Sequence, residues 1–163
     1  MKTLVSIAVL AALCCGLSAA YSQKSIDLEP HLGYTYSCGR FTHVKSSGFE
    51  VGLSASFQVK PRFYINPEVS YVGTREYDWV VSHFIVPIYA SYRLPVKKVT
   101  FDFNVGPYGQ FATKRYLHDF GIAVKAGVAY ERFHFSLQTY QNLIYDSNPM
   151  FFGLAFGYRI PLK

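Results

Sequence analysis

Charged residues are scarce in this chain and make up 16% of its 163 residues, against about a quarter in an ordinary soluble domain. Long apolar runs are missing as well, because nothing beyond the N-terminal segment approaches the roughly 18 consecutive apolar residues that a transmembrane helix needs. Yet half of the chain is hydrophobic and 18% is aromatic. Its hydrophobicity must therefore follow a pattern other than a continuous apolar run.

Cysteine and metal-ligand patterns are also sparse. Of three cysteines, Cys14 and Cys15 lie in the N-terminal segment and only Cys38 lies beyond it. A single cysteine cannot form an intramolecular disulfide, so no disulfide framework holds the fold. The five histidines and Cys38 show no metal-ligand spacing, and we expect neither a metal nor another cofactor.

The formal charge of +6 does not indicate nucleic-acid binding. The basic residues are scattered in pairs, such as Lys97 with Lys98, and form no basic helix or dense stripe. Attraction to anionic membrane lipid and lipopolysaccharide is the expected use of this charge.

The N-terminal segment, residues 1–20, predicts a secretory signal peptide. Lys2 supplies a positive start, Leu4–Leu17 an apolar stretch, and Ser18–Ala20 a small-residue cleavage site. Cleavage is expected after Ala20 or up to residue 23, which leaves residues 24–163 as one exported domain.

From Ile26 onward, apolar and polar residues alternate with a period of two, which predicts β-strands. The alternating ranges are Ile26–Tyr36, Phe49–Val59, Phe63–Tyr71, Phe84–Leu94, Val99–Phe111, Phe120–Tyr130, Phe133–Leu137 and Phe152–Leu162. About eight strands of about ten residues have the length that crosses a bilayer at a tilt. The chain therefore predicts an all-β, eight-stranded antiparallel transmembrane up-and-down barrel.

The predicted connections alternate in length. Long ones lie near Ser37–Ser47, Thr74–Ser82, Thr113–His118 and Tyr145–Pro149, and short ones at Lys60–Arg62, Pro95–Lys98 and Glu131–Arg132. Long outer loops and tight periplasmic turns are the arrangement of outer-membrane barrels. We therefore expect an integral protein of a Gram-negative outer membrane.

A soluble barrel such as a lipocalin would also alternate, but with its apolar face turned inward. The polar face argues against it, because Gly121, Ala123, Lys125, Gly127 and Ala129 carry only one charge. Aromatic residues also gather at both ends of the predicted strands, as barrels held between two lipid interfaces require. The outer girdle comprises Tyr36, Phe49, Tyr71, Phe84, Phe111, Phe120 and Phe152, and the periplasmic girdle comprises Phe57, Phe63, Tyr92, Phe101, Tyr130, Phe133 and Tyr158.

Two features disturb the alternation. Pro30, Pro67, Pro87 and Pro107 fall inside strands, where each removes a ladder hydrogen bond, and they predict bulges or local irregularities. After Leu137 the seventh strand shows no clear lipid-facing side, which predicts a bulge or an exit from the membrane at that point.

Several short motifs resemble the PorT-like outer-membrane β-barrel domain family, whose barrel is similar to the transmembrane domain of OmpA. The motifs are Asn66–Tyr71, Phe84–Ile88, Val105–Tyr108, the glycine-rich Asp119–Tyr130 and Gly153–Ile160. The resemblance implies an eight-stranded antiparallel outer-membrane barrel and no single activity. The chain departs from the usual barrel ending, because it closes on Leu162-Lys163 and not on an aromatic residue.

Strand parity places a set of charged residues inside the predicted barrel. They are Asp27, Glu29, Glu50, Glu68, Arg93, Asp102, Lys125 and Arg159, with His31 and His134 as polar neighbours. Isolated buried charges are costly, so we expect a structural network of salt bridges in a barrel too narrow for an open pore. A narrow path for ions or small solutes is the alternative.

His134 and Ser136 form a His-x-Ser pair of the kind found in barrel enzymes that deacylate lipid A. Parity turns both residues inward and no orienting carboxylate follows, so catalysis is not expected. The predicted outer loops carry Arg40, Lys45, Arg75, Lys114 and Arg115, with Tyr77, Trp79 and Tyr116. Such loops suit contact with lipopolysaccharide or an envelope protein partner. We expect a monomer with a structural, adhesive or envelope-assembly accessory role.

Overall fold

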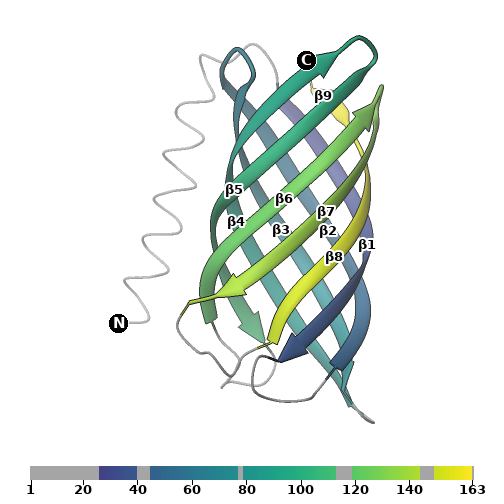
Figure 1. The fold of residues 1–163 in the computed structure, drawn as a ribbon, viewed down its shortest axis with the longest axis vertical. Coiled ribbons are helices and arrows are strands. Elements are labelled where there is room, and N and C mark those ends of the chain that lie inside the picture. The colour runs from purple at the N-terminus through teal and green to yellow at the C-terminus, as the bar shows by residue number, and fades with distance from the viewer. Residues whose placement is uncertain (1–25, 40–44, 77–78, 113–118, 144–148, 163) are drawn as a thin grey trace.

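The computed structural model describes residues 26–39, 45–76, 79–112, 119–143 and 149–162. The strands are β1 (Ile26–Gly39), β2 (Lys45–Lys60), β3 (Phe63–Glu76), β4 (Trp79–Val96), β5 (Val99–Ala112), β6 (Asp119–Tyr130), β7 (Phe133–Asn142), β8 (Pro149–Tyr158) and β9 (Ile160–Leu162). Neighbours in the chain pair antiparallel, and β1 pairs with both β2 and β8. The sheet therefore closes into a barrel whose strands tilt against its long axis (Figure 1). No helix among these residues is long and apolar enough to cross a membrane.

β8 and β9 are two parts of one interrupted strand. Both pair with β1 in the same register, with His31 opposite Gly157 and Leu28 opposite Ile160. Between them, the Arg159 N–H donates a hydrogen bond to the carbonyl oxygen of Arg132 at 2.7 Å. The eight-stranded antiparallel barrel is thus confirmed, whereas the prediction of an unbroken last strand is wrong at Arg159.

Two-residue turns join β2 to β3, β4 to β5 and β6 to β7 at one end of the barrel, where the C-terminus also lies (Figure 1). We call this the short-turn end and the opposite one the loop end. Each turn contains one residue with positive φ, namely Arg62 at 71°, Lys97 at 57° and Glu131 at 54°. Pro95 and Val96 belong to β4, so the second turn is tighter than predicted.

We expect Lys97→Gly to raise the free energy of unfolding by about 0.5 kcal/mol. A side chain in the left-handed region costs about 1–2 kcal/mol, which exceeds the entropy of about 0.5–1 kcal/mol that glycine loses on folding. Urea unfolding in detergent micelles measures the change. Lys98→Gly is the matched control, since its φ is not positive, and it should destabilise the barrel. Effects of the same sign at both positions would contradict the argument.

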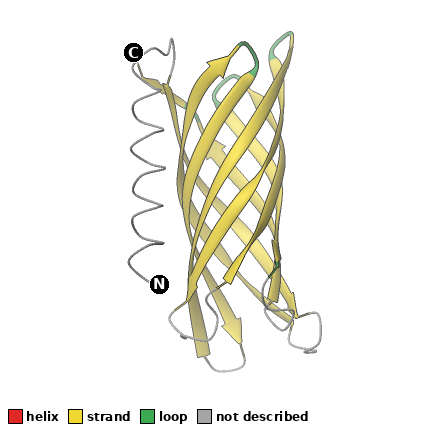
Figure 2. Cartoon of the chain, turned by 90° about the vertical axis from the view of Figure 1, so that its left-hand side faces the viewer, coloured by secondary structure: helices red, strands yellow, loops and turns green. Residues whose placement is uncertain are grey.

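The outer wall of the barrel is apolar. On β5, for example, Phe103 and Val105 are about half exposed, whereas Asp102 and Asn104 are buried. Successive residues of a strand point to opposite faces, and β6 and β7 alternate in the same way. The soluble, lipocalin-like alternative is therefore wrong, because it requires the apolar face inside. Figure 2 shows the tall, single-walled barrel that results.

Aromatic rings of both predicted girdles lie on this outer wall. Near the loop end, the Tyr71 ring packs between Phe49 and Phe84, with ring centroids 5.8 and 5.4 Å away. At the short-turn end, the rings of Phe63 and Tyr92 lie 5.1 Å apart on paired residues. Such aromatic pairs contribute about 0.5–1.5 kcal/mol beyond the area they cover.

Two of the predicted long loops are shorter than expected, because the strands continue into them. Ser37 pairs with Ser46 and Thr74 pairs with Val81. The Ser37 and Ser46 hydroxyl oxygens also form a hydrogen bond of 2.5 Å inside the barrel. The connections reduce to residues 40–44 and 77–78, and these, with residues 113–118 and 144–148, lie outside the described part.

The expected loss of parity in β7 is wrong. Gln138, Tyr140 and Asn142 are buried and Gln141 is exposed, so the alternation runs to the end of the strand. The pairing with β6 and β8 keeps one register throughout. Polar residues at 139 and 141 hid the lipid-facing side from sequence reasoning, but they do not bend the strand.

The prolines interrupt the pairing without shifting it. Cα pairing lapses beside Pro67, Pro87 and Pro107, yet the same register resumes on both sides. Pro30 pairs with Leu53 on the β2 side without interruption, but on its other side the pairing lapses between His31–Gly157 and Leu28–Ile160 and resumes in the same register. The predicted local irregularities therefore occur at all four prolines, and the predicted bulges do not. Within the described ladders, the one register shift lies between Gln58 and Lys60, next to a turn.

Gly106 allows a close approach between β5 and β4. A Cβ there would collide with the carbonyl oxygen of Ile88, and would lie 2.8 Å from its carbonyl carbon and 3.0 Å from the Tyr89 Cα. We therefore expect Gly106→Ala to lower the free energy of unfolding by about 1–3 kcal/mol.

Gly109→Ala on the same strand is the control for Gly106→Ala. Its Cβ would first meet the Phe111 ring, at 3.6 Å, so we expect a neutral or slightly stabilising effect. Urea titrations of both variants in detergent micelles make the comparison. Equal losses would show that the backbone contact with Ile88 does not set the cost.

Candidate functional site

The interior near the short-turn end holds a network of charged side chains. All eight residues that strand parity placed inside take part in it: Asp27, Glu29, Glu50, Glu68, Arg93, Asp102, Lys125 and Arg159. The strands of the closed barrel bring these residues together, although Asp27 and Arg159 lie 132 positions apart along the chain. Side chains that lie far apart in sequence therefore meet as ion pairs.

Arg93 on β4 anchors one side of this network. Its Nη1 lies 2.9 Å from Asp27 Oδ2 and its Nε lies 3.3 Å from Asp102 Oδ1. Nη2 donates a hydrogen bond of 2.6 Å to the Ser56 hydroxyl, and the guanidinium carbon lies 4.0 Å from the centre of the Tyr64 ring. A planar guanidinium suits this combination of carboxylate and ring contacts.

Arg159 and His134 both bind Glu29 and Asp102. Arg159 Nε donates a 2.7 Å hydrogen bond to Glu29, and its Nη2 donates to Asp102. His134 Nδ1 lies 2.6 Å from Glu29 Oε1 and its Nε2 lies 3.2 Å from Asp102 Oδ2. Because both ring nitrogens face carboxylate oxygens, only the doubly protonated imidazolium offers a donor to each.

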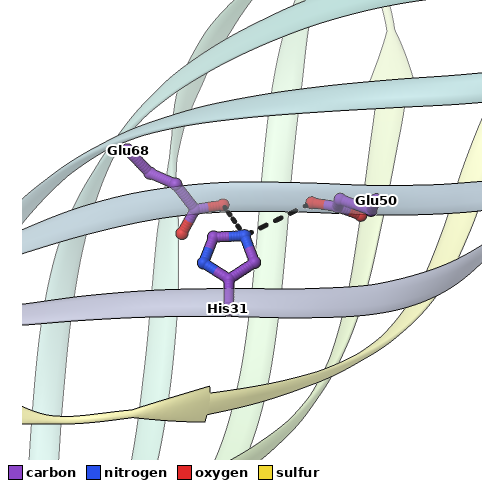
Figure 3. Close-up of side chains that lie close together, drawn as sticks. All are labelled: His31, Glu50 and Glu68. Atoms are coloured by element: carbon purple, nitrogen blue, oxygen red, sulfur yellow. Dashed lines mark ion pairs between the residues drawn. The ribbon is translucent and has the colours of Figure 1, made fainter.

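Further from the turns, His31, Glu50 and Glu68 project from β1, β2 and β3 toward one point (Figure 3). His31 Nε2 lies 3.7 Å from a carboxylate oxygen of each glutamate. The three residues could each offer a metal one ligand atom. Their positions, 31, 50 and 68, have no ligand spacing, so sequence reasoning missed the group. Parity and strand pairing together were the signal that could have found it.

Protein groups already satisfy both glutamates of this cluster. Lys125 Nζ lies 2.9 Å from Glu68 Oε2, and the Ser70 hydroxyl donates to Glu68 Oε1 at 3.1 Å. Glu50 accepts hydrogen bonds from Thr35 at 3.1 Å and from the Tyr140 hydroxyl at 3.3 Å. Buried charges that are paired and hydrogen-bonded need no ion to neutralise them, and we assign no metal to this cluster.

Toward the loop end, the interior holds an aromatic and apolar cluster beside buried polar side chains such as His83 and Gln110. Sequence reasoning did not predict this cluster, which consists of Val72, Ile85, Tyr89, Tyr108, Ala123, Tyr140 and Phe151. The Tyr108 and Tyr140 rings lie 5.3 Å apart, and Phe151 lies 5.2 Å from the His83 ring, both in edge-on geometry. The interior thus has an ionic layer and an aromatic layer, joined where Tyr140 donates to Glu50.

Side chains fill the ionic layer. A cavity between Glu29, Glu68, Lys125 and Arg159 has a volume of about 10 Å³. This is at the lower limit of the space that one water molecule occupies. The packing agrees with the general size of eight-stranded barrels, whose interior is just wide enough for side chains.

His134 and Ser136 both lie inside the barrel and are 3% and 2% exposed. His134 is engaged by Glu29 and Asp102, and in the described structure no hydrogen bond joins it to Ser136. A nucleophile for lipid acyl groups would have to face the lipid, whereas both side chains of this pair are buried inside the barrel. Of the predicted loop residues, Arg40, Tyr77, Lys114, Arg115 and Tyr116 lie outside the described part.

Solved structures share this fold at low sequence identity, although neither a protein-family model nor a curated protein matches the chain. Neisserial surface protein A has a TM-score of 0.63 and 14% identity, with 83% of this chain and 96% of that one covered. Ail, the attachment invasion locus protein of Yersinia pestis, has a TM-score of 0.54 and 12% identity, with 82% and 98% covered. The outer membrane enzyme PagL has a TM-score of 0.52 and 15% identity, with 83% and 99% covered.

These likenesses establish the fold of small outer-membrane barrels. They do not establish a function, because one fold serves a surface protein, an attachment protein and an enzyme. They also do not confirm the PorT-like resemblance, which stays a prediction.

Proposed function

We propose that the chain is an integral outer-membrane protein whose barrel is a rigid scaffold with a structural, adhesive or envelope-assembly accessory role and no catalysis. One observation carries the proposal: an apolar wall surrounds an interior of paired charges. Leu32, Leu53, Val69, Phe103 and Leu137 are each at least half exposed on that wall. Apolar surface of this extent is a liability in water but matches the hydrocarbon of a bilayer.

A narrow channel for small solutes is the competing function. The filled ionic layer and the aromatic layer above it support a scaffold over a channel. We expect the purified protein to give no single-channel conductance in planar bilayers. A steady conductance that disappears on heat denaturation would favour the channel.

The absence of catalysis rests on the inward placement of His134 and Ser136. We expect lipid A from cells that express the protein to keep its mass. Loss of one acyl chain from lipid A, seen by mass spectrometry, would overturn this part of the proposal.

The loop end is the surface that the proposal assigns to contact with other molecules. Arg75 is exposed there, and a guanidinium suits the phosphates of lipopolysaccharide. An attachment protein among the fold relatives supports an adhesive role. We propose a monomer that contacts lipopolysaccharide and an envelope protein partner.

Charged substitutions on the wall test the membrane placement. Val105 lies in the middle of β5 and is 52% exposed. In a bilayer, Val105→Arg should lower the free energy of unfolding by about 2–4 kcal/mol, because it places a charge near the midplane. Refolding into lipid vesicles with urea titration measures the loss.

Val96→Arg is the depth control for Val105→Arg. Val96 is 47% exposed at the short-turn end of β4, where a charge should cost only about 0–1 kcal/mol. Heat-dependent mobility of the protein from isolated outer membranes gives a second test, since a closed barrel migrates differently before and after boiling. A soluble periplasmic protein that tolerates both arginines would overturn the proposal.

A further inference from the structure

The short-turn end of the barrel opens into a cavity of about 330 Å³, which we call the vestibule. Its lining includes Arg62, Arg93, Arg159, Gln58, Tyr64 and Thr100, with two prolines. Arg93 and Arg159 belong to the ionic layer and form its floor, whereas Arg62 projects from the turn between β2 and β3. Three arginines therefore converge on one open cavity.

The vestibule has cationic donors and no acid in its lining. Arg159 uses Nε for Glu29 and Nη2 for Asp102, and within the described residues its Nη1 has no hydrogen-bond partner. A guanidinium carries five N–H donors, so part of this group is available to a ligand. Arg62 is exposed, and no hydrogen bond or ion pair of its side chain occurs in the described part of the chain.

The rim around the vestibule is also basic. The three turns and their neighbours carry Lys60, Lys97, Lys98 and Arg132, against a single acid, Glu131. Arg132 donates a hydrogen bond of 3.3 Å to the Tyr158 hydroxyl. The side chains of the other residues form no hydrogen bond or ion pair within the described part of the chain. The positive charge therefore extends from the cavity to the three turns of the short-turn end.

From this arrangement we infer that the vestibule binds a carboxylate side chain of an acidic peptide segment in a partner protein. Guanidinium groups bind carboxylates through paired, charge-assisted hydrogen bonds. A segment with several carboxylates reaches both the vestibule and the basic rim, whereas a single small anion reaches only one of them. Lipid head groups lie beside the wall, and the vestibule opens inside the ring of strands.

The side of the membrane on which this partner lies depends on the proposed function, which places the short-turn end in the periplasm. The affinity for an acidic peptide does not depend on it. Peptide binding in detergent micelles therefore tests the vestibule, and the arginine substitutions on the wall test the membrane placement. If one of these two experiments fails, the result of the other can still be interpreted.

The test measures fluorescence anisotropy of a labelled hexapeptide of alternating Asp and Glu with the folded barrel in zwitterionic detergent. We expect saturable binding that weakens with salt, and no binding of the Asn/Gln peptide of the same length. Arg62→Gln should weaken binding about tenfold or more, the effect of losing one charge-assisted contact. Arg62→Lys should retain part of the affinity, because it keeps the charge and loses the fork.

Arg75→Gln is the matched control. Arg75 is also an exposed arginine, but it lies at the loop end of β3, away from the vestibule and its rim. We expect it to change the affinity less than twofold, and both variants should keep the heat-dependent mobility of the folded barrel. Equal weakening by the two variants would overturn the vestibule as a site. Displacement of the peptide by an equal concentration of inorganic phosphate would overturn the assignment to a peptide carboxylate.

Discussion

A Lys125→Met variant should lose about 3–5 kcal/mol of unfolding free energy, as expected when one partner of a buried ion pair is removed. Lys125 Nζ lies 2.9 Å from Glu68 Oε2, and the two side chains are 5% and 1% exposed. Methionine preserves much of the volume but leaves the Glu68 carboxylate without its cation. The Ser70 hydroxyl would still donate to it, but one neutral hydrogen bond does not replace a charge. Urea unfolding of the refolded barrel, followed by gel mobility, measures the loss.

The double variant Lys125→Met/Glu68→Gln separates loss of the charge pair from loss of packing. With both charges removed, no uncompensated carboxylate remains, and most of the stability should return. Losses that simply add in the double variant would show that the two residues act independently. In that case the ionic layer would be a set of separate contacts and not a coupled network.

A Phe151→Ala variant should lose a similar amount, about 3–5 kcal/mol, because it empties part of the aromatic layer. Phe151 is fully buried, and its ring contacts the His83 ring edge-on. β8, which carries Phe151, is paired with β1 on one side and β7 on the other. The barrel wall therefore cannot move inward to fill the space that the ring leaves. The cost therefore includes both the lost transfer free energy and the cavity.

Phe152→Ala is the control for this prediction, since it makes the same change on the adjacent residue. Phe152 is 45% exposed and borders a hollow of about 590 Å³ on the outer wall. Acyl chains of detergent or lipid can fill the space that its ring leaves, so no cavity term applies and a smaller loss is expected. Urea titration in the same micelles compares the two. A larger loss for Phe152→Ala would mean that the wall, and not the interior, determines the stability.

Parity was sufficient to predict much of this molecule, because a strand offers only two faces. Residues such as Glu68 and Lys125 could be placed inside without knowledge of their partners. Parity did not predict that Lys125 binds Glu68. Several carboxylates point into the barrel, and which of them lies beside Lys125 depends on how far the strands are shifted along one another. It also overlooked Phe151, because the neighbouring aromatic Phe152 points outward, and Tyr140, because the polar residues at 139 and 141 hid the direction of that part of β7.

The amino-acid sequence by itself determined the barrel class and the direction of each face, since the period-two alternation and the turn positions are local properties. Only the tertiary structure decided which interior residues meet. Closing the sheet pairs β1 with β8 and fixes how far each strand is shifted along its neighbour. The tertiary structure likewise decided the break between β8 and β9 at Arg159 and the vestibule at the short-turn end. Both depend on contacts between residues far apart along the chain, and no local pattern encodes the level at which such residues come to lie.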